Sequence, residues 1–396
     1  MMPTAQTEIS PVLVTGARIF DGHAWHEDRA LAVSGSVVAG IGDEAAFQSA
    51  SQRHDCESCL IVPGFVDLQV NGGGGVLLNN DPSLAGIQKI CSAHRAFGTT
   101  ALLPTLITDT AEITERAIAA GVAATQAKVS GFAGLHLEGP HLSVARKGTH
   151  SPDLIRPMTE DDVQRLVEAA LLLPKLLVTL APESTTPDQV RALVEAGVVV
   201  SLGHSNAGLD DIRKFVAAGA TMVTHLFNAM SPLHHRDPGL VGAAIGLGEL
   251  SCGLIADGHH VDPLAIQIAL DAKRGPGHVF LVTDAMSSIG STEQSFQLNG
   301  REVFRRGGRL TLADGTLAGA DIDMLSCVRF MIKTIGMGLD EAVRMATRYP
   351  AEACGLDGFG LLASGNRADF LVLNKDMDIQ ASVIGGEWLD PRELVA

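Results

Sequence analysis

Eight short runs of apolar and β-branched residues recur along the middle of the chain. They lie at residues 63–70, 99–106, 132–138, 176–183, 198–205, 222–229, 250–257 and 279–285. Strands that are apolar along nearly their whole length are typical of a parallel sheet covered on both faces. Helical spacing of apolar residues predicts helices at 83–97, 110–126, 160–172, 187–196, 210–218, 262–272, 324–335 and 339–349.

Alternating strands and helices of this number predict an α/β fold, a TIM-like (β/α)8 barrel that we place at 63–362. In such barrels the functional residues lie at the carboxyl ends of the strands. Both ends of the chain instead contain short strands and glycine-containing turns, at 11–20, 29–42, 59–62, 368–374 and 381–389. We therefore predict a small β-sandwich domain formed by both termini, residues 1–62 plus 363–396.

Composition and charge exclude some classes of function. Hydrophobic residues make up 46% of the chain and charged residues 19%, which is enough for a large buried core. The formal net charge of −16 argues against a nucleic-acid surface, because phosphate backbones are bound by clustered Lys and Arg. No signal-peptide pattern opens the chain and no run of about 18 apolar residues occurs, so we expect a cytoplasmic location without membrane contact.

Three residues in predicted strands have the chemistry of a metal site: Glu138 and His204 at strand ends, and His225 in the middle of its run. A set of two histidines and one carboxylate leaves a coordination position open for water, as in hydrolytic zinc enzymes. Each residue also has a simpler interpretation. A buried salt bridge would explain the glutamate, and hydrogen-bonded core histidines are common.

Two further residues are candidates for catalysis. Asp284 ends the last predicted strand and could act as a general base beside the metal, or as a partner of a histidine ligand. His150 follows Arg146–Thr149 and could donate to a substrate carbonyl or be an exposed loop residue. The loops SPLHHRDPGL and ADGHHV carry Arg236 and His260, which could bind an anion or form solvated loops.

Several of these segments together resemble one known family. PGFVDLQVNGGGG, HLEGPHL, KGTH, TLAPE, LGHSNA, THLFNAM, RDPGL, ADGHHV, LVTDAM and LAG occur in the order found in N-acetylglucosamine-6-phosphate deacetylases, members of the amidohydrolase superfamily. The resemblance runs from Pro63 to Gly319. It implies metal-dependent hydrolysis of a phosphorylated N-acetyl amino sugar.

The resemblance also implies a role for each matching position. Glu138, His204 and His225 would bind the metal, Asp284 would be the catalytic base, and His150 would polarise the acetyl carbonyl. The implied substrate contacts are Asn228, Ala229, Arg236, His260, Leu317, Ala318 and Gly319. In this family the arginine reaches into the neighbouring subunit, so a homodimer is implied with Arg236 at the partner's site.

The chain departs from the wider superfamily at the end of the first barrel strand. An HxH motif that forms a second metal site is frequent there, whereas this chain has Gln69 and Asn71. Neutral amides are poor zinc ligands, so we predict one divalent metal ion per subunit. Zn²⁺ is the expected ion, with Fe²⁺ or another divalent ion as the alternative.

The leading hypothesis is hydrolysis of N-acetyl-D-glucosamine 6-phosphate to D-glucosamine 6-phosphate and acetate. The galacto epimer is the nearest alternative substrate, because one hydrogen bond to the C4 hydroxyl can switch preference. Another amide or imine hydrolase of the superfamily is a second alternative, although such enzymes typically keep the HxH motif. A non-enzymatic sugar-binding protein would be expected to lose Asp284 or a metal ligand.

Overall fold

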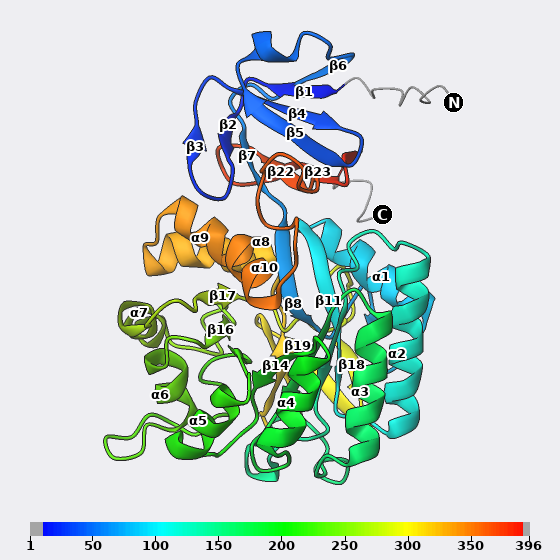
Figure 1. Cartoon of the computed structure of the whole chain (residues 1–396), viewed down its shortest axis with the longest axis vertical. Coiled ribbons are helices and arrows are strands. Elements are labelled where there is room, and N and C mark those ends of the chain that lie inside the picture. Colours follow the sequence, from blue (N-terminus) through cyan, green and yellow to red (C-terminus); the bar gives the residue numbers. More distant parts are fainter. Residues whose placement is uncertain (1–10, 391–396) are drawn as a thin grey trace.

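The computed structural model describes residues 11–390 and contains an eight-stranded parallel barrel sheet in the order β17-β16-β15-β14-β13-β12-β11-β8. Figure 1 shows this sheet below a smaller β-rich layer. The barrel strands are β8 (Phe65–Val70), β11 (Thr99–Ile107), β12 (Leu135–Glu138), β13 (Leu176–Leu180), β14 (Val199–Leu202), β15 (Met222–Val223), β16 (Ser251–Leu254) and β17 (Val279–Leu281). Each falls within or overlaps one of the predicted runs, so the predicted barrel is confirmed.

The barrel closes at the carboxyl ends of its first and last strands. Val70 forms an isolated parallel bridge with Ala285, just beyond β17. The backbone N–H of Asn71 donates to the Ala285 carbonyl at 2.8 Å, and that of Asp284 donates to the Gln69 carbonyl at 2.9 Å. The first and last strands are therefore joined at the level where the candidate catalytic residues lie.

Helices pack around the outside of the barrel (Figure 1). They are α1 (Leu84–Arg95), α2 (Ala111–Gln126), α3 (Glu160–Leu172), α4 (Pro187–Glu195), α5 (Leu209–Ala217), α6 (Gly239–Gly246), α7 (Pro263–Ala272), α8 (Met324–Phe330), α9 (Leu339–Ala346) and α10 (Arg348–Cys354), with a π-helical turn at Met331–Ile335 and 3-10 turns at Glu44–Phe47 and Val144–Arg146. Thr159 and Thr186 begin α3 and α4 with capping boxes that pair the first free amides. Helix α6 was not predicted.

Strands from both chain ends form two further sheets above the barrel. One has the order β5-β4-β1-β6 and the other β24-β23-β22-β7-β2-β3. Their bounds are β1 (Val12–Thr15), β2 (Arg18–Phe20), β3 (Trp25–His26), β4 (Ala30–Ser34), β5 (Val37–Gly42), β6 (Gln52–Asp55), β7 (Leu60–Pro63), β22 (Phe370–Leu373), β23 (Ile379–Ile384) and β24 (Glu387–Leu389).

The two chain ends are joined by β7 and β22, which pair antiparallel with Ile61 opposite Val372. An apolar cluster of their own fills the space between the sheets and includes Leu31 and Phe370. The predicted β-sandwich from both termini is confirmed as an architecture. Its boundaries at 62 and 363 stay predictions, and residues 1–10 and 391–396 lie outside the described residues.

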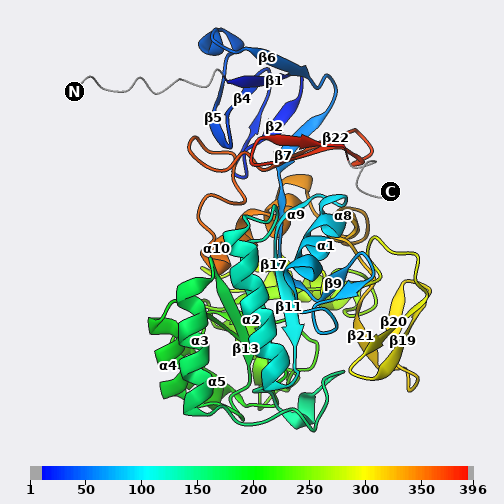
Figure 2. The same ribbon diagram turned by 90° about the vertical axis from the view of Figure 1, so that its right-hand side faces the viewer.

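A four-stranded antiparallel sheet between β17 and α8 was not predicted. Its strands are β18 (Ser295–Leu298), β19 (Arg301–Arg306), β20 (Arg309–Thr311) and β21 (Leu317–Ala320). A short pair, β9 (Gly72–Gly73) and β10 (Val76–Leu77), lies near it (Figure 2). Ala320 bridges to Ala285, which fixes this sheet to the barrel mouth. In the part of the chain that the structure describes, no helix is long and apolar enough to cross a membrane.

Candidate active site

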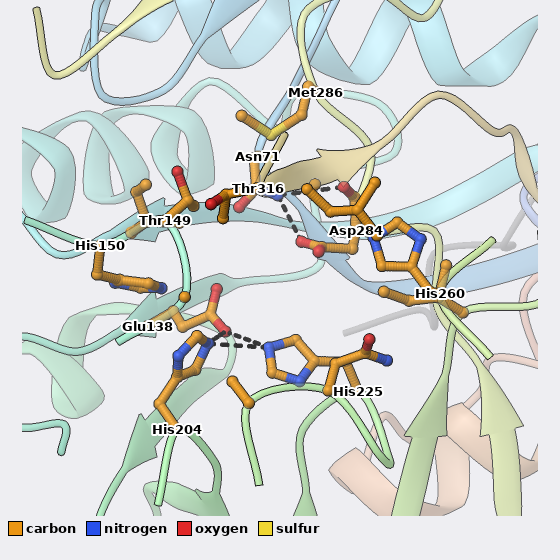
Figure 3. Close-up of a pocket in the computed structure, with 17 residues that line it drawn as sticks. Asn71, Glu138, Thr149, His150, His204, His225, His260, Asp284, Met286 and Thr316 are labelled. Atoms are coloured by element: carbon orange, nitrogen blue, oxygen red, sulfur yellow. Dashed lines mark hydrogen bonds and ion pairs between the residues drawn. The ribbon is translucent and has the colours of Figure 1, made fainter. Parts of the chain in front are cut away.

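Three buried side chains converge at the barrel mouth. Oε1 of Glu138 lies 3.2 Å from Nε2 of His204 and 3.1 Å from Nε2 of His225. The two Nε2 atoms are 3.0 Å apart. Figure 3 shows the three side chains pointing at one another. When nitrogen and oxygen ligands each lie about 2.0–2.2 Å from one ion, their donor atoms are separated from one another by distances similar to these three. The donor set therefore suits a divalent cation.

Backbone conformation directs these side chains into the mouth. His204, His225 and Asp284 each follow a strand and have φ angles of 47°, 32° and 51°, in the left-handed region. Non-glycine residues rarely adopt this region, and such strain clusters at functional sites. The predicted sixth strand was too long. Strand β15 ends at Val223, so His225 lies beyond the strand end and not within the strand.

Neighbouring groups orient the cluster. Nδ1 of His204 donates to the Arg146 carbonyl at 2.9 Å, which leaves the lone pair of Nε2 facing the cluster. Gln69 Nε2 lies 3.2 Å from both carboxylate oxygens of Glu138. Burial alone would raise the pKa of Glu138, but the two imidazole rings against its carboxylate hold it well below its usual value. Glu138 is therefore a negative carboxylate in this cluster, and a bound cation would supply the positive charge that balances it.

Asp284 lies across the mouth from this cluster (Figure 3). Burial, and next the negative charge of Glu138, raise the pKa of Asp284 to about 6. Asn71 Nδ2 donates to Asp284 Oδ1 at 2.6 Å. A buried carboxylate with a raised pKa can accept and release a proton near neutral pH, which suits a general base that later acts as an acid.

His150 is buried beside the cluster and not exposed on its loop. Its ring meets that of His204 edge-on with centroids 4.4 Å apart. Nδ1 lies 2.7 Å from the Thr108 hydroxyl. Burial holds the pKa of His150 well below its usual value, so the ring is neutral. The Thr108 hydroxyl also lies 3.4 Å from the Glu138 carbonyl oxygen. When the hydroxyl donates to Nδ1, the ring proton resides on Nε2.

Most of the predicted site residues line one cavity of about 250 Å³. Its lining includes Asn71, Glu138, His150, His204, His225, Asn228, Ala229, His260, Asp284, Leu317 and Gly319. Three predicted residues are not among those that line it. Gln69 lies behind Glu138, Ala318 is fully buried, and Arg236 is exposed on its loop.

The cavity also has lining residues that were not predicted. They are Ile107, Gly148, Thr149, Ile255, Met286 and Thr316. Thr316 enters from the unpredicted sheet, immediately before Leu317, which the family resemblance had already indicated. Thr149 directly precedes His150. Their positions beside predicted residues were the only signal in the sequence.

An imidazole paired with a carboxylate lies at the edge of the cavity. Nδ1 of His260 is 2.6 Å from Oδ2 of Asp257, and both side chains are more than nine-tenths buried. Burial would raise the pKa of Asp257, but the hydrogen bond and positive charge of His260 lower it. The carboxylate holds the ring through Nδ1, which leaves Nε2 for a ligand in the cavity.

Comparison with known proteins agrees with this geometry. The model of the amidohydrolase family matches residues 60–389. The chain belongs to the amidohydrolase family. Family membership implies a divalent metal ion and hydrolysis of an amide, for which Glu138, His204 and His225 are the possible ligand set.

Individual relatives in this family are also similar over nearly the whole chain. N-acetylgalactosamine-6-phosphate deacetylase of Shewanella sp. is 42% identical over 380 residues, 96% of each chain. N-acetylglucosamine-6-phosphate deacetylase of Haemophilus influenzae is 32% identical over 91% of this chain and 94% of the relative. The crystal structure of N-acetylglucosamine-6-phosphate deacetylase from Pasteurella multocida has a TM-score of 0.92 at 33% identity, covering 96% of this chain and 100% of that one. The resemblance to deacetylases of this type is confirmed.

Proposed function

We propose that this amidohydrolase hydrolyses N-acetyl-D-glucosamine 6-phosphate to D-glucosamine 6-phosphate and acetate. The main support is that one cavity contains a His₂Glu ligand set, a buried carboxylate with a raised pKa and an imidazole paired with Asp257. The first group suits a metal ion, the second suits proton transfer, and the third suits a phosphate.

A divalent ion held by Glu138, His204 and His225 would supply Lewis-acid chemistry and lower the pKa of a water molecule. Asp284 accepts a proton from the attacking water and returns it to the nitrogen of the leaving amine as the C–N bond breaks. His150 donates from Nε2 to the acetyl oxygen as negative charge develops there. Glu138, His150, His204 and His225 are buried, which strengthens their interactions because water does not screen them.

The metal is proposed to be one zinc ion per subunit, with iron as the alternative. The ligand set accepts several divalent ions. Gln69 and Asn71 occupy the positions of a second site, but each donates a hydrogen bond to a carboxylate. Metal quantification of purified protein tests this proposal, and two ions per subunit would contradict it.

In the substrate-binding part of the cavity, His260 is proposed to bind the phosphate, and Asn228 with the Ala229 backbone the sugar. Leu317 and Gly319 form a wall. The galacto epimer is a second candidate substrate. The 42% identity to the Shewanella enzyme favours it, against 32% to the Haemophilus and 37% to the human N-acetylglucosamine-6-phosphate deacetylase.

Arg236 is proposed to bind the phosphate of a neighbouring subunit in a cytoplasmic homodimer. Its exposure and its absence from the cavity lining of its own chain support action between subunits. Neither Arg236→Ala nor Asp284→Asn should be active alone at low substrate concentration. Mixed dimers should regain one complete site, with Asp284 from one subunit and Arg236 from the other. Failure of mixed dimers to recover activity would remove Arg236 from the neighbour's site.

Acetate release tests the function directly. The assay compares N-acetylglucosamine 6-phosphate, its galacto epimer and unphosphorylated N-acetylglucosamine, with metal-quantified protein. Fast turnover of the first and little of the third is the expected result. Preference for the galacto epimer would keep the mechanism and change the substrate. No acetate from any of them would refute the deacetylase.

A further inference from the structure

Asn71 has a side chain whose two ends face different surroundings. It lies at the closure of the barrel and is 3% exposed. Its Nδ2 donates to Asp284 Oδ1 at 2.6 Å and reaches the Asp284 backbone carbonyl at 3.3 Å. Both partners are acceptors, so the amide must present Nδ2 to them. Figure 3 shows the two dashed contacts joining these residues.

The other end of the amide is left without a partner. Among the residues that the structure describes, the buried Oδ1 of Asn71 accepts no hydrogen bond. Asn71 also lines the cavity. Buried amide oxygens are nearly always paired. An unpaired acceptor at the wall of a cavity therefore indicates a ligand that donates a hydrogen bond there.

We propose that Oδ1 of Asn71 accepts the N–H of the scissile acetamide. This inference rests on the proposed function. The substrate has one N–H at the bond to be broken, and its nitrogen must receive a proton from Asp284. Since Asn71 is hydrogen-bonded to Asp284, the Asn71 side chain would hold both the carboxylate of Asp284 and the substrate nitrogen in position for proton transfer.

The role is that of a positioning residue with a defined chemical consequence. When water adds to the acetyl carbon, amide resonance ends, the nitrogen becomes pyramidal and its lone pair is localised on it. An N–H held by Oδ1 turns that lone pair towards Asp284, which donates the proton it took from the water. The C–N bond then breaks with its electrons on nitrogen. Asn71 is thus assigned to selecting amides that carry an N–H, and not to a vestigial second metal site.

The experiment measures binding in a background where Asp284 cannot act. Metal-loaded Asp284→Asn protein is compared with the Asp284→Asn, Asn71→Ala double variant by calorimetry. The ligands are the N-acetyl hexosamine 6-phosphate that the wild type hydrolyses and its 2-O-acetyl counterpart, in which oxygen replaces N–H. Loss of the acceptor should weaken binding of the amide by about tenfold and change binding of the ester by less than about twofold.

A matched control and separate outcomes make the result decisive. Asn79 is also a buried asparagine at the mouth, donating to the Ile107 carbonyl at 3.0 Å, but it does not line the cavity. Asn79→Ala in the same background should leave the amide-to-ester ratio unchanged. Equal weakening of both ligands by Asn71→Ala, or no weakening, would overturn the inference. Absence of wild-type acetate release would instead refute the proposed function.

Discussion

His260 Nδ1 lies 2.6 Å from Asp257 Oδ2, so the imidazole at the edge of the cavity is paired with a buried carboxylate. Asp257 Oδ1 also accepts the backbone N–H groups of His259 and His260 at 2.8 Å each. Asp257→Asn would keep an oxygen for these amides and remove the negative charge beside the ring. Charge-assisted hydrogen bonds are about twice as strong as neutral ones.

We therefore expect Asp257→Asn to raise KM for the phosphorylated substrate by about tenfold, because the ring of His260 loses its hydrogen bond to a negative carboxylate. KM for the unphosphorylated sugar should barely change. Steady-state kinetics on both sugars measures the difference. Equal increases in the two KM values would show that Asp257 supports the loop without tuning a phosphate contact.

Thr108 is expected to determine which nitrogen of His150 carries the proton. The hydroxyl lies 2.7 Å from Nδ1, so removing it would free the ring to place its proton on the wrong side. Thr108→Val should lower kcat by about 10- to 100-fold at nearly constant KM. Thr108→Ser should restore most of the activity. If serine fails where valine fails, the methyl group is needed as well as the hydroxyl, and the hydrogen bond alone does not account for the loss.

Asp284→Asn should lower turnover by about 100- to 10,000-fold, since the amide cannot accept a proton. Metal content should stay at the wild-type value because Asp284 is not in the ligand cluster. In the wild type, activity should fall as pH decreases through about 6 or below, since protonation inactivates the base. Retained turnover in the variant would remove Asp284 from proton transfer.

Gln69→Leu should weaken metal binding by about 10- to 100-fold, because the amide that steadies both Glu138 oxygens is lost. A chelator competition titration measures the affinity. Gln189→Leu is the matched control, since that amide caps α4 and donates to the Met158 carbonyl far from the ligands. The same affinity in both variants would mean that Gln69 does not tune the metal.

The barrel was predictable because its strands are apolar on both faces and repeat regularly. Helix α6 was missed because its sequence, GLVGAAIG, is apolar on all sides, contains three glycines and has no side-chain cap. The predicted helix at 339–349 is two helices. It breaks at Thr347, whose φ of −132° and ψ of −82° are not helical, and Pro350 fits within the first turn of α10.

At the site, residue type and strand position predicted the ligands, because a carboxylate or histidine in an apolar run is conspicuous. Thr316 and Thr149 carried no such signal, since threonine is ordinary in loops and strands. The sheet of β18–β21 was missed because no parallel-strand pattern extends to it. The partnership of Asn71 with Asp284 spans 213 residues and depends on barrel closure, which only the structure reveals.

Asp67 allows a prediction about stability that is independent of catalysis. It is fully buried in β8, with Oδ2 accepting from the Thr283 hydroxyl at 2.6 Å. Burial raises its pKa from the usual 3.8 to about 7, against the hydrogen bonds from Thr283 and Gln69. The folded state thus holds a proton that the unfolded state releases. The stabilisation is complete below about pH 3.8 and is lost as pH rises through about 7.

The asparagine in Asp67→Asn cannot ionise, so the variant should not lose this part of its stability as pH rises. Relative to wild type, the variant should gain thermal stability as pH rises from 5 to about 8, with an upper bound of roughly 3 kcal/mol for the two pH units between 5 and about 7, at about 1.4 kcal/mol per unit. Asp162→Asn is the control. Hydrogen bonds from Arg156 and Thr159 outweigh burial and lower the pKa of Asp162, so that variant should be less stable by a constant amount over the same range. Parallel pH profiles for wild type and Asp67→Asn would mean that Asp67 is already ionised in the folded protein, stabilised by the three hydrogen bonds from Thr283 and Gln69.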